Sequence, residues 1–398
     1  MTPADKVAGA GTSSPDEIER RRRALELSGW GLPFRFLQPR NPCFWIFVAL
    51  VAWGAFQMWK QLSQVNLEFT TQLSSVVLLG LYGLILGLIF LKVDRYGGQP
   101  GRLLTAALLW GGVAAVFGMA IPANDALSEI YGKVFGQAFV IDWWAAFSAP
   151  IVEETSKAAG FLLLLGLAPG RIRSVWDALL VGAFLGLGFE ILEDLIYTFN
   201  AAAGSSGADQ VQAALQMFFV RSGTGFFSHA IYTALFCSGL IYLIGTPALP
   251  RSTGRGILLM VAAVISHGVW DGAGAIANGG GAAILVSAGI VVVMALVFTY
   301  VYRLGAPRER EWMRDILRPE ETGGAISGEE LDAAAGTWRQ SRSFVRTPGG
   351  NRRFRGRKRR RQAVKASRHL ARELVASGGV DSPGVDKVRT KIALLRTI

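Results

Sequence analysis

Cysteine, histidine and charge are all scarce in this chain of 398 residues. The only two cysteines, Cys43 and Cys237, lie in apolar surroundings, and neither their number nor their spacing fits a disulfide framework or a thiolate metal site. Only three histidines are present. Charged residues make up 18% of the chain against 51% hydrophobic residues, so the composition excludes an ordinary soluble globule.

The sequence instead contains several long apolar segments. A helix needs about 20 mostly apolar residues to cross roughly 30 Å of hydrocarbon, and several runs reach that length. We therefore predict an all-α, polytopic transmembrane helix bundle. Its eight spans are expected at residues 43–60, 72–92, 103–122, 143–167, 174–200, 222–246, 255–277 and 282–302.

Lysine and arginine gather in alternate loops between these spans. They are frequent before the first span, in three alternate loops and after the last span, whereas the remaining loops hold only Lys60, Lys133 and Arg221. The positive-inside rule then places both termini in the cytoplasm, which requires an even number of spans. The sequence thus predicts an integral protein of the plasma (inner) membrane.

Three parts are predicted along the chain: a cytoplasmic N-terminal arm at 1–42, the transmembrane helical domain at 43–302 and a cytoplasmic polar and basic tail at 303–398. Within this tail, Ser327 and Glu330 have the spacing of a capping box at the start of a short helix. Residues 341–356 are rich in Arg, Gly, Ser and Pro, a composition that predicts disorder.

The tail supplies the basic excess of the chain. Between Arg339 and Arg372 there are 14 Lys or Arg residues and no Asp or Glu. Juxtamembrane cations are attracted to anionic headgroups, so we predict that the tail binds an anionic lipid surface. Nucleic acid is a weaker expectation because few aromatic residues accompany the charges. An apolar stripe within a basic amphipathic helix would face the lipid: Ala363, Val364, Leu370 and Leu374.

Two GxxxG patterns predict close helix contacts inside the bundle. Gly182 and Gly186 lie in the fifth predicted span, and Gly268 and Gly272 lie in the seventh. Small residues at this spacing let two helices approach each other in lipid, so we expect these faces to be buried.

Ionisable side chains occur inside four successive apolar spans, where they are costly and usually functional. The fourth span carries Glu153, Glu154 and Lys157. Glu153 precedes Lys157 by one helical turn, which is the favourable order for an ion pair, but such a pair does not account for Glu154. These spans also carry Glu193, His229 and His267.

Further acids accompany these residues. Glu190, Glu193 and Asp194 share one face of the fifth span, an arrangement suited to general acid/base work or to a metal ion. Asp271 follows His267 by one turn, as an acid that orients a histidine would. Counted from the outer ends of the spans, the glutamates and histidines fall at one depth, roughly 10–17 Å below the outer surface. We therefore expect a single site.

Four motifs on these spans resemble the PrsW family of intramembrane proteases, over roughly residues 72–302. Residues 153–157 resemble its EExxK motif, and residues 189–194 its FxxxE[N/D] motif, with Asp194 where Asn is common. His229, and His267 with Asp271, resemble its later histidine motifs. The family is grouped with the CAAX prenyl and bacteriocin-immunity type membrane proteases.

This resemblance implies hydrolysis of a membrane-protein substrate, such as a membrane-bound anti-sigma factor, near the extracytoplasmic side. Glu153 or Glu154 would be the general base for water. His229 and His267 would be metal ligands or oxyanion stabilisers, and Glu193 a metal ligand or second acid. Zn²⁺ held by Glu193, His229 and His267 is one expectation, and a metal-free glutamate mechanism is the other. Lys157 would balance charge and Asp271 would orient His267.

A different function class uses the same residue types, since proton-coupled transporters also carry chains of Asp, Glu and His. A transporter needs polar residues toward both faces of the membrane. The cytoplasmic halves of the spans, such as residues 161–167 and 235–244, are nearly free of ionisable groups. That one-sidedness favours a pocket over a conduit. A catalytically inactive scaffold with a working basic tail is a third alternative. The sequence predicts no particular oligomeric state.

Overall fold

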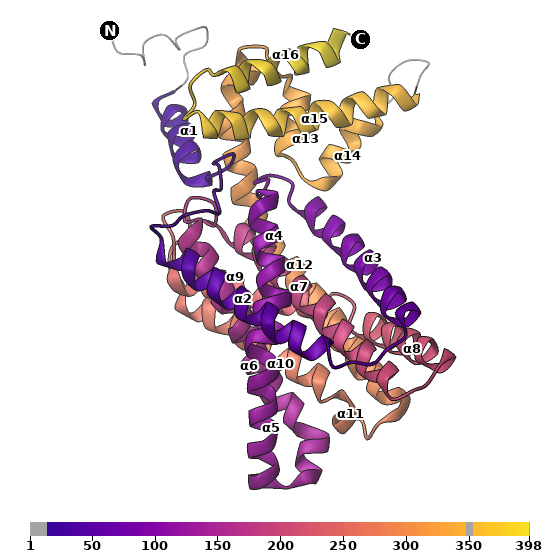
Figure 1. The fold of residues 1–398 in the computed structure, drawn as a ribbon. Coiled ribbons are helices and arrows are strands. Elements are labelled where there is room, and N and C mark those ends of the chain that lie inside the picture. Colours follow the sequence, from indigo (N-terminus) through magenta and orange to yellow (C-terminus); the bar gives the residue numbers. More distant parts are fainter. Residues whose placement is uncertain (1–13, 348–352, 398) are drawn as a thin grey trace. The chain divides into compact units, whose positions relative to one another are not determined.

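The computed structural model describes residues 14–347 and 353–397, and this part of the chain contains helices and no β-strand (Figure 1). It divides into two compact units. The membrane unit comprises residues 34–94 and 100–303. The polar unit comprises the described residues of 1–33, 95–99 and 304–398.

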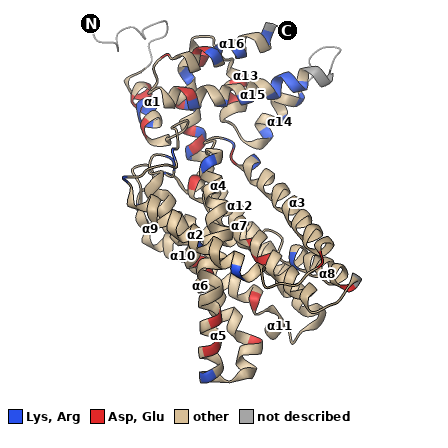
Figure 2. Ribbon diagram, in the orientation of Figure 1, with Lys and Arg blue, Asp and Glu red and all other residues tan. Residues whose placement is uncertain are grey.

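The membrane unit is an all-α bundle of long apolar helices, as predicted. Figure 2 shows few charged residues along them. Its elements are α2 (Pro42–Leu62), α3 (Phe69–Val93), α4 (Gly101–Leu109), the π-helix η2 (Trp110–Ala120), α5 (Ile121–Phe135), α6 (Gln137–Leu167), α7 (Val175–Ala203), α8 (Ala208–Thr224), α9 (Ser228–Ile244), α10 (Thr253–Asp271), α11 (Ala273–Ile276) and the first part of α12 (Gly280–Thr322).

Seven helical segments of the described chain are long and apolar enough to cross a membrane. They are Pro42–Leu62, Phe69–Val93, Gly101–Phe135, Val175–Ala203, Asp209–Ile244, Thr253–Asp271 and Gly280–Thr322. Helix α6 has the length, but Glu153, Glu154 and Lys157 interrupt its apolar sequence. Helix α6 is not among the seven, so the eighth predicted span stays a prediction.

Two predicted spans are broken in the structure. The span expected at 222–246 is interrupted at residues 225–227, where Phe227 has a left-handed backbone (φ 65°), and only then does α9 begin. The span expected at 255–277 ends at Asp271, and Gly272 separates α10 from α11. As a result His229 lies in the first turn of α9 and His267 near the end of α10.

Helix α7 lies at the centre of the membrane unit and packs against α3, α4, η2, α8 and α9. A capping box between Ser174 and Asp177 starts it. The predicted GxxxG contact is confirmed: a Cβ atom on Gly182 would lie 2.8 Å from the Thr233 carbonyl oxygen, and one on Gly186 would lie 2.2 Å from that of His229. Only glycine permits this approach of α7 to α9.

The second GxxxG pattern brings α10 close to α6. A Cβ atom on Gly268 would lie 2.7 Å from the carbonyl oxygen of Ala146, and one on Gly272 would lie 3.1 Å from the Cβ of the same alanine. Both predicted glycine pairs therefore hold together the helices that carry the ionisable residues of the spans.

The polar unit is also helical and has its own core. It contains α1 (Pro15–Ser28), the last part of α12, α13 (Gly328–Ala335), α14 (Trp338–Arg346), α15 (Arg353–Ala376) and α16 (Pro383–Thr397). Trp30 and Trp312 meet edge to face with ring centroids 6.2 Å apart. The predicted capping box of Ser327 and Glu330 is confirmed at the start of α13.

The tail differs from the prediction in two respects. Disorder was expected at 341–356, but α14 covers residues 341–346 and α15 begins at 353, while 348–352 lie outside the described residues. A capping box between Thr337 and Gln340 starts α14, and packing against α15 supports it. The predicted basic helix exists as α15, but its apolar stripe is at most 5% exposed and packs inside the polar unit: Ala363, Val364, Leu370 and Leu374. That stripe is therefore not available to lipid.

The α7–α9 contact can be tested with the smallest possible change. Gly186→Ala adds a Cβ atom 2.2 Å from the His229 carbonyl oxygen, so the helices must separate. Overpacking of this kind costs about 1–3 kcal/mol, and the thermal unfolding midpoint in detergent should fall. Gly80→Ala is the matched control because its Cβ would meet no atom within 4 Å. Equal midpoints for the two variants would contradict the close contact.

Candidate functional site

A buried lysine stands at the centre of the ionisable residues. Lys157 of α6 is fully buried, and its Nζ lies 2.8 Å from Glu154 Oε1 and 3.4 Å from Glu153 Oε2. The same Nζ lies 3.1 Å from Nδ1 of His229 and 3.8 Å from the ring centroid of Phe189. One ammonium group thus contacts both glutamates, including Glu154, for which the sequence offered no partner.

The two adjacent glutamates are held differently. Glu154 accepts a hydrogen bond of 2.9 Å from the Thr233 hydroxyl in addition to its short contact with Lys157. Glu153 has only longer contacts, from the Asn124 amide at 3.5 Å to Oε1 and from Lys157 at 3.4 Å to Oε2. Glu154 is therefore fixed by both oxygens, whereas Glu153 retains capacity to accept a further hydrogen bond.

The two histidines meet beside these acids. Their ring centroids are 4.9 Å apart and their planes are nearly perpendicular. His229 Nε2 lies 3.0 Å from Glu193 Oε2. His267 lies between two carboxylates, with Nδ1 3.3 Å from Glu154 Oε1 and Nε2 3.4 Å from Asp271 Oδ2. The ring of Tyr232 stacks on His267 with centroids 5.1 Å apart.

The structure brings all the predicted site residues into this one cluster, from helices α6, α7, α9 and α10. The cluster consists of Glu153, Glu154, Lys157, Glu193, His229, His267 and Asp271.

Several buried polar atoms of the cluster lack a well-formed hydrogen bond to the described residues. They are Nε2 of His229, both ring nitrogens of His267 and Oδ2 of Asp271. Their carboxylate neighbours are close but poorly aligned. Buried polar atoms are normally satisfied, so orphaned donors and acceptors gathered at one point indicate a site for a ligand, a water molecule or an ion.

One group of three residues has the geometry for a metal ion. Glu153, His229 and His267 each offer one ligand atom, and these atoms lie within 4.8 Å of one another. Imidazole and carboxylate ligands suit zinc, so the donor set fits such an ion. Glu193, which the sequence placed among the ligands, is not in this group, and its Oε2 contacts both His229 and Arg221.

Arg221 is a member of the site that the sequence did not single out. It lies in α8, which was expected to be a loop, and its Nε donates to Asp194 Oδ1 at 2.6 Å. A second nitrogen pairs with Glu193. The guanidinium also stacks over Tyr197, 4.1 Å from the ring centroid. The available signal was that Arg221 is the only charged residue between 210 and 228.

The three acids of α7 therefore have separate environments. Glu193 faces the cluster, and Asp194 faces Arg221. Glu190 accepts a hydrogen bond of 2.6 Å from the Tyr82 hydroxyl and lies 3.4 Å from the backbone nitrogen of Ala230. Glu193 and Asp194 thus share Arg221 as a partner, whereas Glu190, on the same helical face, pairs with Tyr82 instead.

Residues 99–301, half of the chain, match the model of the PrsW family intramembrane metalloprotease. The chain belongs to the PrsW family. It is therefore an integral membrane peptidase whose substrate is a membrane protein, which sets aside the transporter alternative. No curated protein and no solved structure matches the chain. The matched residues contain the four helices of the cluster.

The role of Arg221 can be tested by removing its charge. Arg221→Gln leaves Glu193 and Asp194 buried without their shared cation, and breaking a buried pair costs about 3–5 kcal/mol. We expect a clear fall in the thermal unfolding midpoint in detergent. Arg102→Gln removes an exposed arginine of the same unit and should leave the midpoint unchanged. A fall of the same size in both variants would mean that net charge, and not this pair, matters.

Proposed function

We propose that the cluster around Lys157 is the hydrolytic site of this PrsW-family peptidase. The carrying observation is that four helices deliver carboxylates and imidazoles to one buried point where several of their polar atoms lack hydrogen bonds. By resemblance to the family, the substrate would be a membrane protein such as an anti-sigma factor, cut near the extracytoplasmic side.

Glu153 is the proposed general base. A base must accept the proton of an attacking water molecule, so it needs an oxygen that is not already saturated. Glu153 meets this condition because its contacts are 3.4 Å or longer. Glu154 does not, since Lys157 and Thr233 fix its two oxygens. We therefore assign Glu154 to positioning Lys157 and His267.

The tautomer of His229 follows from its neighbour. An ammonium group can only donate, so Nδ1 of His229 accepts from Lys157 and its Nε2 carries the hydrogen on the side of Glu193. His267 lies between Glu154 and Asp271 and is suited to donate a proton or a hydrogen bond to the oxygen that gains charge when the peptide carbonyl is attacked. Asp271 would orient this ring.

A metal ion is the second component to be decided. Glu153, His229 and His267 would hold it, in which case Glu153 would be a ligand and not the base, and when bound the ion would act as a Lewis acid on the peptide carbonyl. Lys157 already places a positive charge beside Glu153 and His229, two of the three residues that would hold the ion. This supports the alternative mechanism, in which no metal ion takes part. The two mechanisms predict different responses to chelation.

The orientation of the chain is also a proposal. With an even number of spans, the positive-inside rule places both termini, and hence residues 1–42 and 303–398, on the cytoplasmic side of the plasma membrane. Anionic lipid headgroups on that side would face the basic polar unit.

The proposed catalytic roles predict that each of two single substitutions lowers peptidase activity. Glu153→Gln and His267→Ala should each lower peptide cleavage by about 100-fold or more, since general acid–base groups contribute 10²–10⁴-fold. Purified full-length protein would be incubated in detergent with a panel of single-span membrane proteins, and products would be identified by mass spectrometry.

His369→Ala is the matched control for these variants. His369 is the third histidine of the chain and is half exposed on α15, outside the family match. The His369→Ala variant should cleave the substrate at the normal rate. If Glu153→Gln retains more than half of the normal turnover, Glu153 is not the base.

The metal question has its own measurement. If zinc is held as proposed, elemental analysis of the purified protein should find about one equivalent, because three protein ligands and one open position complete a catalytic zinc site. His229→Ala should lose the metal and His369→Ala should retain it. Full cleavage after exhaustive chelation would rule out a metal role and leave the glutamate mechanism.

A further inference from the structure

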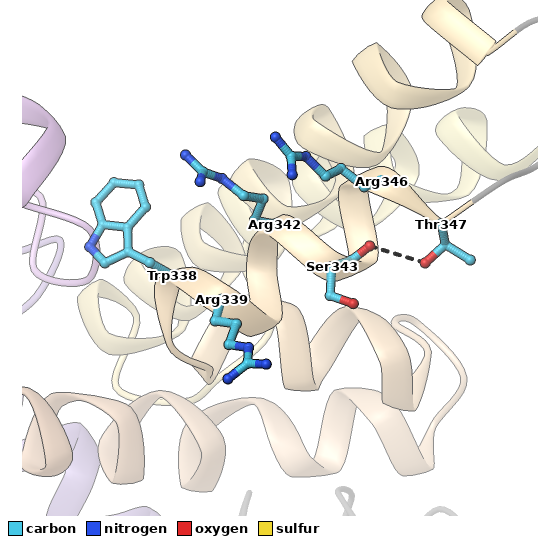
Figure 3. Close-up of a pocket in the computed structure, with 6 residues that line it drawn as sticks. All are labelled: Trp338, Arg339, Arg342, Ser343, Arg346 and Thr347. Carbon is cyan, nitrogen blue, oxygen red and sulfur yellow. Dashed lines mark hydrogen bonds between the residues drawn. The ribbon is translucent and has the colours of Figure 1, made fainter.

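Helix α14 of the polar unit borders an open hollow of about 810 Å³ that the peptidase site does not use. Its lining residues, Trp338, Arg339, Arg342, Ser343, Arg346 and Thr347, all come from this helix and its end (Figure 3). The three arginines, Ser343 and Thr347 are exposed, and Val345 on another face of the helix is buried. The helix therefore presents a cationic face to its surroundings.

The arginines of this face differ from others in the same unit. Arg389 pairs with Glu320 and Asp381, and Arg396 pairs with Glu330. Within residues 14–347 and 353–397, no acidic side chain pairs with Arg339, Arg342 or Arg346. The sequence of α14 itself contains no Asp or Glu.

Two of these side chains are arranged side by side. Arg342 and Arg346 are one helical turn apart and extend in the same direction, as Figure 3 shows. Like charges at this spacing destabilise a helix, and no acid offsets the repulsion here. Arg339 extends in a different direction. The pair of parallel guanidinium groups offers several N–H donors to one anion.

We propose that the Arg342–Arg346 face of α14 is a binding site for the phosphate of an anionic lipid headgroup. Guanidinium groups bind phosphate oxygens through paired N–H donors, a geometry that lysine cannot reproduce. The proposal gives the lipid contact suggested above a defined site, and it rests on the proposed membrane side of the polar unit but not on peptidase activity.

Two observations favour a lipid as the source of the phosphate. The chain passes directly from the apolar part of α12 into the polar unit at Leu304, so the unit is tethered where a membrane span ends. Trp338, at the same hollow, is 52% exposed, and tryptophan is enriched at membrane–water interfaces. A single tryptophan does not form the stacking platform that single-stranded nucleic acid requires.

The test uses purified full-length protein in detergent and short-chain dioctanoyl phosphatidic acid as the probe, with bound lipid counted by native mass spectrometry. Dioctanoyl phosphatidylcholine, inorganic phosphate and a short single-stranded oligonucleotide are run as competitors. Arg342→Gln/Arg346→Gln removes two contacts and should bind phosphatidic acid about 100-fold more weakly, since each charge-assisted contact is worth roughly a factor of ten. Cleavage of a membrane-protein substrate in detergent should be unchanged.

The matched control is Arg361→Gln/Lys365→Gln, which removes an equal charge from two exposed residues one turn apart on α15. Its binding should stay close to that of the unaltered protein. An equal loss in both double variants, or no binding of phosphatidic acid, would overturn the proposal. Displacement of the lipid by inorganic phosphate or the oligonucleotide at lower concentration than phosphatidic acid itself would also overturn it, because the site would then serve another anion. Circular dichroism of each variant verifies that the helices are intact.

Discussion

The arrangement of the site depends on the buried ammonium group of Lys157. Several carboxylates lie within the bundle, and an isolated buried charge costs many kilocalories per mole. Lys157 contacts Glu153, Glu154 and His229 at 2.8 to 3.4 Å. Losing one partner of a buried pair costs about 3–5 kcal/mol, so the lysine and its acids must be buried together. The shorter contact of Lys157 with Glu154 leaves Glu153 the less constrained glutamate.

Close helix packing makes this contact possible. Side chains reach one another only if their helices approach to within backbone contact, and here glycine supplies that approach. Gly186 lies against the backbone of His229, and Gly268 lies against that of Ala146 in α6. The glycines therefore set the distance between the helices that carry the acids and those that carry the histidines. The geometry of the cluster therefore depends on the packing of the bundle.

Sequence reasoning predicted the helices and the membership of the cluster better than the contacts within it. Apolar length identified the spans, and ionisable residues in lipid identified Glu153, Glu154, Glu193, His229 and His267. It missed α8 and the break before α9, because the local pattern does not show where a glycine-rich segment leaves the helix. It also expected disorder in α14, whose stability comes from packing against distant residues that composition does not report.

The break between α8 and α9 has a consequence for Arg221. If the predicted span had run from residue 222 as one continuous helix, Arg221 would have been a charged residue in a surface loop. Instead α8 carries Arg221 to Asp194 and Glu193, and Trp270 of α10 donates to the Thr224 carbonyl at 3.0 Å beside the break. The residues at 225–227 separate the end of α8 at Thr224 from the start of α9 at Ser228, next to His229. The interrupted segment thus supplies both a cation, Arg221, and a histidine, His229, to the same carboxylate of Glu193.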